Sequence, residues 1–373
     1  MKSASLRSAA FVALSYGVNA VYQGYISKFY QQQGISHGAL TLLLVCFPVI
    51  SMFSLPFWGA RSDRSARPRR VLQSAVLLAA LAALLWPGGR LIPAGIAFAC
   101  CYPAVQPLAD SLILQSLQAA QKPYGPVRLA GSAAFAAVNL LYGRLLRDDY
   151  SPVPWSVCAG LAALLLAAFL LPCGKRKTPP VKAPLRKLLT LPHMRPLLLL
   201  FMLLQLTLGV FYNFFSIYFT ALPGADSAWL GRAFCLSALS EIPFLLLGDR
   251  LFTRWGPGPL LLAAALIMSL RYLLLGMASS LPLALASQAL HGGGFVVITF
   301  AMARYVAREA DEGLRARGQT LLSVAGFGLS RACGILLGGF LNAGPGLKTG
   351  FLLLAAMALG GFCAFLPWLR RAR

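Results

Sequence analysis

The stretch Gly174–Arg195, GKRKTPPVKAPLRKLLTLPHMR, divides the chain into two apolar blocks of similar length. It contains seven Lys and Arg residues and no acid. Pro179, Pro180 and Pro184 prevent a helix from running straight through it, because proline lacks the backbone N–H that a helix interior needs. We interpret this stretch as a cytoplasmic linker between two membrane-embedded halves.

The composition supports a membrane protein. Of the 373 residues 58% are hydrophobic and 12% are charged, which is too apolar for a chain of this size to cover its own surface in water. The net charge of +23 does not indicate nucleic-acid binding, because the basic residues gather at the ends of apolar segments. The eight cysteines show no metal-ligand spacing, and we expect no cofactor and no metal site.

Twelve apolar segments approach the length of about 20 residues that a transmembrane helix needs. They lie near 7–30, 38–59, 71–88, 91–115, 125–146, 153–173, 196–220, 227–248, 258–276, 281–304, 318–340 and 348–368. Six precede the basic linker and six follow it. The sequence therefore predicts an all-α polytopic membrane protein with two six-helix halves, residues 1–173 and 196–373, joined by 174–195.

The distribution of Lys and Arg predicts the orientation in the membrane. In the twelve-segment arrangement, 24 of the 33 basic residues fall on the side of the linker and both termini, and six fall on the other side. Cytoplasmic loops carry the excess of basic residues. We expect both termini and the linker to be cytoplasmic, in a multi-pass protein of the cell membrane.

Five charged residues fall inside predicted spans: Arg128, Arg271, Arg331, Asp110 and Glu241. A charge at the bilayer centre costs about 3 kcal/mol on insertion scales. Such residues face a wet cavity or a partner of opposite sign, so these five are the primary candidates for function.

The loop after the second segment reads FWGARSDRSARPRR, residues 57–70. Its pattern resembles the Gly-x-x-x-Asp-Arg-x-x-x-Arg-Arg signature of the major facilitator superfamily, and a weaker echo, Gly248-Asp249-Arg250, follows segment eight. The resemblance implies a twelve-helix transporter working by alternating access, with a cytoplasmic gate. The expected gate residues are Gly59, Asp63, Arg64, Arg70 and Asp249.

Asp63 lies where its helix ends, and it can pair with an arginine or a neighbouring helix end to hold the cytoplasmic face shut. The alternative is that the arginines of this loop serve only as topology signals.

Asp110 on segment four and Arg128 on segment five lie within roughly 8 Å of the cytoplasmic ends of their spans, so they can pair. This arrangement resembles the branch that includes phenylpropionate permeases, nucleoside–proton symporters and lactose permease. The resemblance implies a substrate-binding role for both residues. Ala130 replaces the tryptophan that is usual in this motif, and a structural ion pair is the alternative.

Three motifs of the second half resemble the same branch: SALSEIPF at 237–244, Ser269-Leu-Arg271, and SQALHGG at 287–293. Glu241, Arg271 and His291 lie roughly 12 to 20 Å from the cytoplasmic ends of their spans, near the bilayer centre. The arginine keeps its charge, while a carboxyl and an imidazole can exchange protons.

We expect these three residues to couple transport to protons, with Glu241 as the proton carrier. Gly294 stands where lactose permease has a further acid. A static polar cluster that holds helices together is the alternative.

Helices one and seven should line the substrate cavity in this fold. Polar side chains recur on one face of each, and amides and phenols on these faces could bind a polar or aromatic substrate, although they also join membrane helices. The expected cavity residues are Tyr16, Asn19, Gln23, Asp110, Arg128, Gln205, Tyr212, Asn213, Gln288 and Arg331.

The sequence therefore predicts a secondary active transporter, a proton symporter of a small organic solute such as an aromatic acid, a nucleoside or a sugar. A drug/proton antiporter and a non-transporting scaffold or sensor are the alternatives. An enzyme is disfavoured, because neither HExxH nor GxSxG occurs. The expected partners are the substrate, protons and the lipid bilayer, and the expected state is a monomer.

Overall fold

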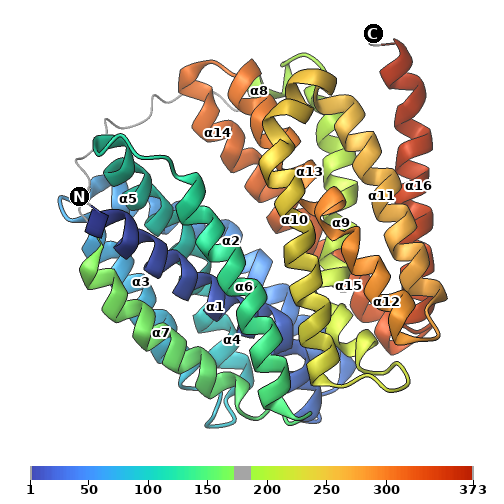
Figure 1. Ribbon diagram of the computed structural model, residues 1–373, viewed down its shortest axis with the longest axis horizontal. Helices are drawn as coiled ribbons and strands as arrows, with labels where there is room; N and C mark the ends of the chain where they lie inside the picture. The colour runs from blue at the N-terminus through green and yellow to red at the C-terminus, as the bar shows by residue number, and fades with distance from the viewer. Residues whose placement is uncertain (1, 172–185, 372–373) are drawn as a thin grey trace. The chain divides into compact units, whose positions relative to one another are not determined.

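The computed structural model describes residues 2–171 and 186–371, which form helices joined by turns and short loops (Figure 1). The part before the linker comprises α1 (Lys2–Gln32), α2 (His37–Arg64), α3 (Pro68–Ala83), α4 (Leu91–Cys101), η1 (Tyr102–Ala104), α5 (Val105–Ala119), α6 (Gly125–Leu146) and α7 (Val153–Leu170). The part after it comprises α8 (Arg186–Leu189), α9 (Met194–Phe219), α10 (Ser227–Trp255), α11 (Pro257–Met277), α12 (Leu281–Ala289), α13 (His291–Glu309), α14 (Glu312–Leu322), η2 (Ser323–Ser330), α15 (Arg331–Ala343) and α16 (Leu347–Arg371).

All twelve predicted spans are helical. Ten helical segments among the described residues are long and apolar enough to cross a membrane. The remaining two predicted spans correspond to α1 and α3. Helix α3 has only 16 residues. Helix α1 has 31 residues, but polar side chains such as Asn19 and Gln23 interrupt its apolar sequence. Residues 174–185 of the predicted linker lie outside the described residues, and Arg186–Leu189 in its second half form the short helix α8.

The chain divides into two compact units. The first comprises Met1–Pro179 with Asp226–Cys235, and the second comprises Pro180–Ala225 with Leu236–Arg373. Helix α10 therefore begins with residues that pack in the first unit and continues in the second.

The two units repeat one pattern of helix contacts. In the first, α1 packs against α6 and α7, and α3 packs against α7 and α4. In the second, α9 packs against α15 and α16, and α11 packs against α16, α12 and α13. Each helix of the second unit thus occupies the place of a helix six spans earlier, which is the internal repeat typical of secondary transporters.

Two predicted spans contain breaks that position the candidate site. Segment 281–304 is divided at Leu290 into α12 and α13. Segment 318–340 contains the π-helix η2, in which the Ser330 hydroxyl donates to the carbonyl of Ala325 five residues earlier at 2.7 Å. Short π-helical stretches inside α-helices often mark functional sites, and this one leads directly to Arg331.

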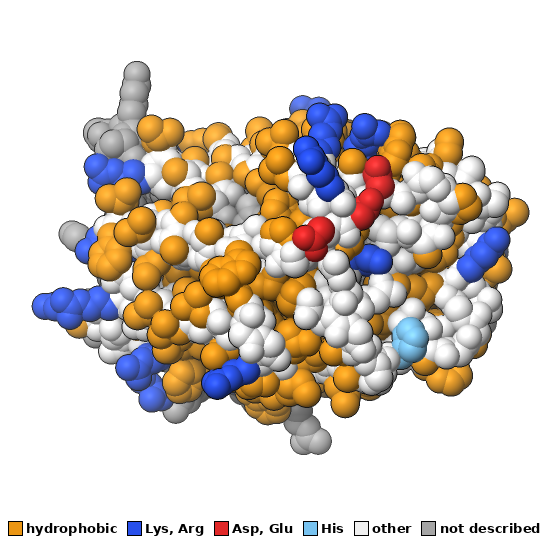
Figure 2. All heavy atoms as spheres, turned by 90° about the horizontal axis from the view of Figure 1, so that it is seen from below, with side chains coloured by type: hydrophobic (Ala, Val, Ile, Leu, Met, Phe, Trp, Pro, Cys, Tyr) orange, Lys and Arg blue, Asp and Glu red, His pale blue; other side chains and the backbone are white. Residues whose placement is uncertain are grey.

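Large apolar side chains remain exposed along the helices, as lipid contact requires. Phe53, Leu145 and Leu246 are each more than 70% exposed. Hydrophobic side chains spread over the face that Figure 2 presents. Because a soluble monomer rarely exposes contiguous apolar surface on this scale, the structure agrees with a multi-pass membrane protein.

Candidate functional site

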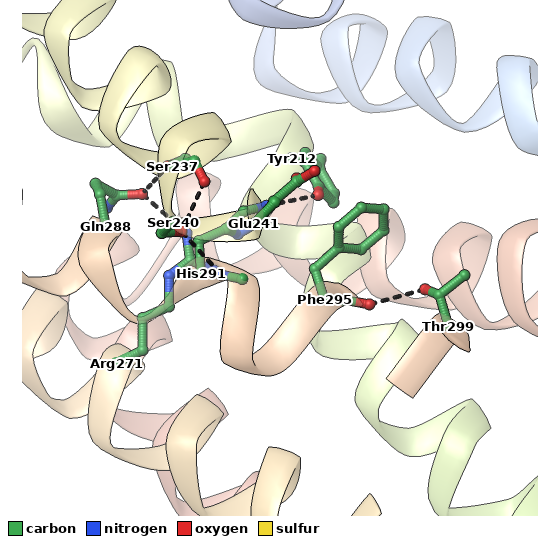
Figure 3. Close-up of polar contacts among 10 residues, drawn as sticks. Tyr212, Ser237, Ser240, Glu241, Arg271, Gln288, His291, Phe295 and Thr299 are labelled. Carbon is green, nitrogen blue, oxygen red and sulfur yellow. Dashed lines mark hydrogen bonds and ion pairs between the residues drawn. The ribbon is translucent and has the colours of Figure 1, made fainter. Parts of the chain in front are cut away.

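The candidate site of the second unit centres on Glu241 of α10 and His291 of α13 (Figure 3). Nε2 of His291 lies 3.5 Å from Oε1 of Glu241 and 3.0 Å from the hydroxyl of Tyr212 on α9. The imidazole is buried, whereas the Glu241 side chain is 16% exposed. Of the two residues that are expected to act with Glu241 in coupling, His291 is the one in contact.

The break at Leu290 and the glycines that follow bring His291 to Glu241. A Cβ on Gly292 would collide with the backbone of Ser240 and Glu241, so only glycine allows α13 to approach α10 this closely. The N–H of Gly292 donates to the Ser240 hydroxyl at 2.9 Å, which satisfies a donor in the first turn of α13.

The two polar neighbours of His291, Glu241 and Tyr212, meet the same ring nitrogen, Nε2. When Nε2 carries the proton it can donate to Glu241, and when Nε2 is bare it can accept from Tyr212. Nδ1 is buried and has no hydrogen-bond partner among the described residues. An N–H at Nδ1 would be buried and unpaired, so the geometry favours the neutral ring that carries its proton on Nε2 and donates to Glu241.

Arg271 of α11 is 1% exposed and does not reach Glu241 within ion-pair distance. Its Nη2 donates to Oε1 of Gln288 at 2.9 Å, and the guanidinium lies 3.8 Å from the ring centre of Phe211. Its Nε has no acceptor among the described residues. This cation is held by an amide and an aromatic ring rather than by a carboxylate.

Gln288 of α12 joins three helices in this part of the unit. Its Oε1 accepts from Ser237 on α10 at 2.9 Å as well as from Arg271, and its Nε2 donates to the Ser287 hydroxyl at 2.8 Å. The orientation of the amide is fixed by these neighbours, because a flipped amide would point two donors at the guanidinium. Gln288 therefore positions Arg271.

Arg331, at the start of α15, carries the second cation of the site. Its Nε donates to Oε1 of Gln205 on α9 at 3.2 Å. The guanidinium lies 4.6 Å from the ring centre of Phe327 and 5.0 Å from that of Tyr212. Among the residues that the structure describes, no carboxylate lies within 4.0 Å of Arg331 or Arg271. The site thus combines one carboxylate with two arginines.

The first unit has a smaller polar cluster around Asp110 of α5. Its Oδ1 accepts from Tyr124 at 2.7 Å and from Gln106 at 2.9 Å. Arg128 of α6 forms no ion pair with Asp110 within 4.0 Å, and its guanidinium lies 4.4 Å from the ring centre of Tyr16 instead. The direct pair that the sequence allowed is replaced by a tyrosine and a glutamine that were not anticipated.

The other expected cavity residues are partly exposed within their units. Asn19 accepts from the Tyr102 hydroxyl at 3.5 Å, and Asn213 donates to the carbonyl of Gly209 at 2.9 Å in its own helix. Gln23 and Tyr16 are also partly exposed. The role of these residues in a substrate cavity stays a prediction.

The gate motif differs between the units. In the second unit Asp249 forms an ion pair with Arg304 of α13, a partner that the sequence did not indicate. Among the described residues no ion pair forms at Asp63, and a Cβ on Gly59 would meet nothing within 4 Å. Arg64 and Arg70 are exposed.

No group of three or more His, Cys, Asp and Glu side chains in the described part of the chain has the arrangement of a metal site.

The fold and the site define a polytopic membrane transporter. The model of the MFS_1 like family matches residues 6–353, so the chain belongs to this family of the major facilitator superfamily and is not an enzyme.

Relatives with known names are transporters as well. The maltose permease of Geobacillus stearothermophilus is 28% identical over 93% of this chain and 90% of its own length. The probable 3-phenylpropionic acid transporter of Escherichia coli is 28% identical over 80% of this chain and 81% of its own. The solved nucleoside transporter NupG superposes with a TM-score of 0.78 at 17% identity, covering 98% of this chain and 99% of that one, which shows the shared fold.

Proposed function

We propose that this transporter is a proton symporter that imports a small organic acid with an aromatic or apolar body. The observation that carries the proposal is the charge of the site in the second unit. Among the described residues, Arg271 and Arg331 have no carboxylate partner within 4.0 Å, and Glu241 contacts His291 instead. An anionic substrate supplies the missing negative charge.

The same groups provide a reason for coupling. With His291 neutral, the empty site has two positive arginines and an ionised Glu241, which leaves one net positive charge. When Glu241 takes up a proton and a substrate carboxylate binds, the net charge is again one. A site that carries the same charge in both states meets the same electrostatic cost in crossing the low-dielectric membrane, whereas an anion without its proton would change that cost.

The surroundings of Arg331 suit a carboxylate attached to a ring. Arginine presents two parallel N–H donors to a carboxylate, and aromatic rings pack against an aromatic body. Phe327 and Tyr212 lie beside the Arg331 guanidinium, at 4.6 and 5.0 Å from ring centre to Cζ. The relative from Escherichia coli that bears the name of a 3-phenylpropionic acid transporter supports this substrate class.

Glu241 is the proposed proton carrier and His291 its partner. Glu241 is the more exposed of the two, so its carboxyl can exchange a proton with water, while the buried imidazole donates a hydrogen bond to it from Nε2. Tyr212 links this pair to Arg331, since its hydroxyl meets His291 and its ring faces the guanidinium.

Within this proposal the site opens in turn to each side of the membrane, and the two six-helix halves provide the moving parts. The protein lies in the cytoplasmic membrane with both termini in the cytoplasm, works as a monomer, and uses Gly59, Asp63, Arg64, Arg70 and Asp249 in its cytoplasmic gate.

A sugar is the second candidate, because the maltose permease is the relative that matches over the largest share of this chain among the two named above. Asn19, Gln23 and Asn213 could hydrogen-bond to hydroxyl groups. A neutral sugar would leave both arginines unmatched in the loaded state, which is why we place the acid first.

The test is uptake by proteoliposomes that contain the purified protein, with labelled 3-phenylpropionate, maltose and uridine supplied in parallel. We expect accumulation of 3-phenylpropionate when the outside is acidic, and none when a proton-conducting uncoupler is present. Accumulation of maltose alone would show that the substrate is a sugar rather than an organic acid. Equal equilibration of every compound with and without a pH gradient would contradict symport.

A further inference from the structure

The end of α2 and the start of α3 line an open pocket in the first unit, which includes Arg64 and Arg70 of the proposed cytoplasmic gate. Its volume is about 520 Å³, within the range of roughly 300–1,000 Å³ that is common for small-molecule sites. Its walls are formed by Phe57, Ala60, Arg61, Arg64, Ser65, Arg70, Val71 and Ser74.

The pocket is basic. Arg61, Arg64 and Arg70 line it, and no acid does. Within residues 2–171 and 186–371, none of these three guanidinium groups forms an ion pair within 4.0 Å. Arg69, by contrast, donates to the carbonyls at the end of α7 at 3.3 and 3.1 Å, which occupies it structurally.

Three arginines around one pocket repel each other, and an anion among them would relieve that repulsion. Guanidinium groups match the oxygens of a phosphate with paired N–H donors. The Ser65 hydroxyl oxygen already accepts from the N–H of Arg67 at 3.1 Å, so its hydrogen remains to be donated to an anion. The polar part of the pocket therefore suits a phosphate group.

The other part of the pocket is apolar and exposed. Phe57 forms one wall and is 60% exposed, and Phe53, one turn earlier on the same face of α2, is 73% exposed. Helix α2 is one of the helices that can cross a membrane, and its basic end lies at Arg61 and Arg64. A ligand that fills both parts has an anionic head and apolar chains.

We propose that this pocket binds an anionic phospholipid, with the phosphate between Arg61, Arg64 and Arg70 and the acyl chains along Phe57 and Phe53. Basic pockets at the membrane surface are suited to anionic lipid head groups, and each Lys or Arg contributes to the attraction. The site lies at the loop of the Gly59-to-Arg70 motif, so the lipid would hold the ends of α2 and α3 together.

The test uses the full chain purified in a neutral detergent. Phosphatidylglycerol and phosphatidylcholine with identical acyl chains are titrated, and bound lipid is counted by native mass spectrometry beside thermal unfolding. We expect phosphatidylglycerol to bind preferentially and raise the melting temperature. The Arg61→Gln/Arg70→Gln variant, which removes one cation from each helix, should bind phosphatidylglycerol on the order of 10- to 30-fold more weakly.

The matched control is Arg67→Gln/Arg254→Gln, which removes two exposed arginines that do not line the pocket. It should retain the preference. If the double pocket variant does not fold, Arg61→Gln alone should show about a fivefold loss. Equal binding of the two lipids, an equal loss in the control, or the same protection by inorganic phosphate without lipid would overturn the proposal.

Discussion

The polar clusters of the two units stabilise charged side chains inside the membrane with different partners. The cluster of the first unit has one acid and one arginine, and Asp110 is held by Tyr124 and Gln106 while Arg128 stacks on Tyr16. In the cluster of the second unit one acid faces a histidine, and among the described residues two arginines are held by amides and aromatic rings without a carboxylate. The first cluster is balanced, and the second has a surplus of positive charge that a substrate can complete.

The backbone contact that builds the second cluster should be the most sensitive point. Gly292→Ala places a Cβ against the backbone of Ser240 and Glu241, which cannot move aside without separating α13 from α10. We expect a loss of about 3–4 kcal/mol or failure to fold, measured by thermal unfolding in detergent.

The control is Gly131→Ala in the first unit, where the Cβ would meet side-chain atoms of Tyr16 at 2.8 Å and of Val12 at 2.9 Å. Side chains can shift, so its loss should stay near 1–2 kcal/mol. Equal stability of the two variants would show that the close approach at Gly292 is not required.

Gln288→Leu should cause the next largest loss of stability. It removes the oxygen that accepts a hydrogen bond from the buried Arg271, at a cost of about 2–3 kcal/mol. The matched change in the first unit, Gln106→Leu, leaves Asp110 with the hydrogen bond from Tyr124 and should cost about 1 kcal/mol. Thermal unfolding of both variants under one condition decides whether the second cluster depends more strongly on its amide.

Arg331→Gln should weaken binding of an aromatic carboxylate by about 30-fold, since a hydrogen bond to a charged group contributes roughly 1.5–3 kcal/mol. Arg128→Gln in the first unit should change the same dissociation constant less than about threefold, because its cluster is already balanced. Isothermal titration with 3-phenylpropionate measures both. A larger effect of Arg128→Gln would move the carboxylate site to the first unit.

Tyr212→Phe should have the smallest effect on stability, about 1 kcal/mol, because it removes the hydroxyl that contacts Nε2 of His291. It should also move the pH at which uptake is half-maximal, since Tyr212 contacts the proposed proton site. Tyr124→Phe should cost a similar amount without moving the pH profile of uptake. If the two variants had the same pH profile of uptake, Tyr212 would have no part in proton coupling.

Much of the fold could be predicted from the sequence because lipid contact imposes a simple rule. Every predicted span is helical, since an apolar segment of about 20 residues has no other stable form in a bilayer. The breaks inside spans were not predicted. Leu290 ends α12 inside the predicted span 281–304, and η2 contains only the weak signal of Gly326 and Gly328, so both segments keep the hydropathy of a single span.

The candidate site could be predicted in part. Depth along the helix placed Glu241 and His291 at a similar level, and they are in contact. Which residues face each other around a helix depends on rotation and on the close approach at Gly292, which sequence spacing does not determine. For this reason Gln106, Tyr124 and Phe327 were missed, as was Arg304, the partner of Asp249.

The central claim is that Glu241 carries the coupled proton. The most direct measurement is the pH change outside weakly buffered proteoliposomes when 3-phenylpropionate is added, recorded beside exchange of labelled for unlabelled substrate at equilibrium. We predict alkalinisation with the native protein, and in Glu241→Gln no alkalinisation while exchange continues. Alkalinisation of the same size in Glu241→Gln would contradict the account.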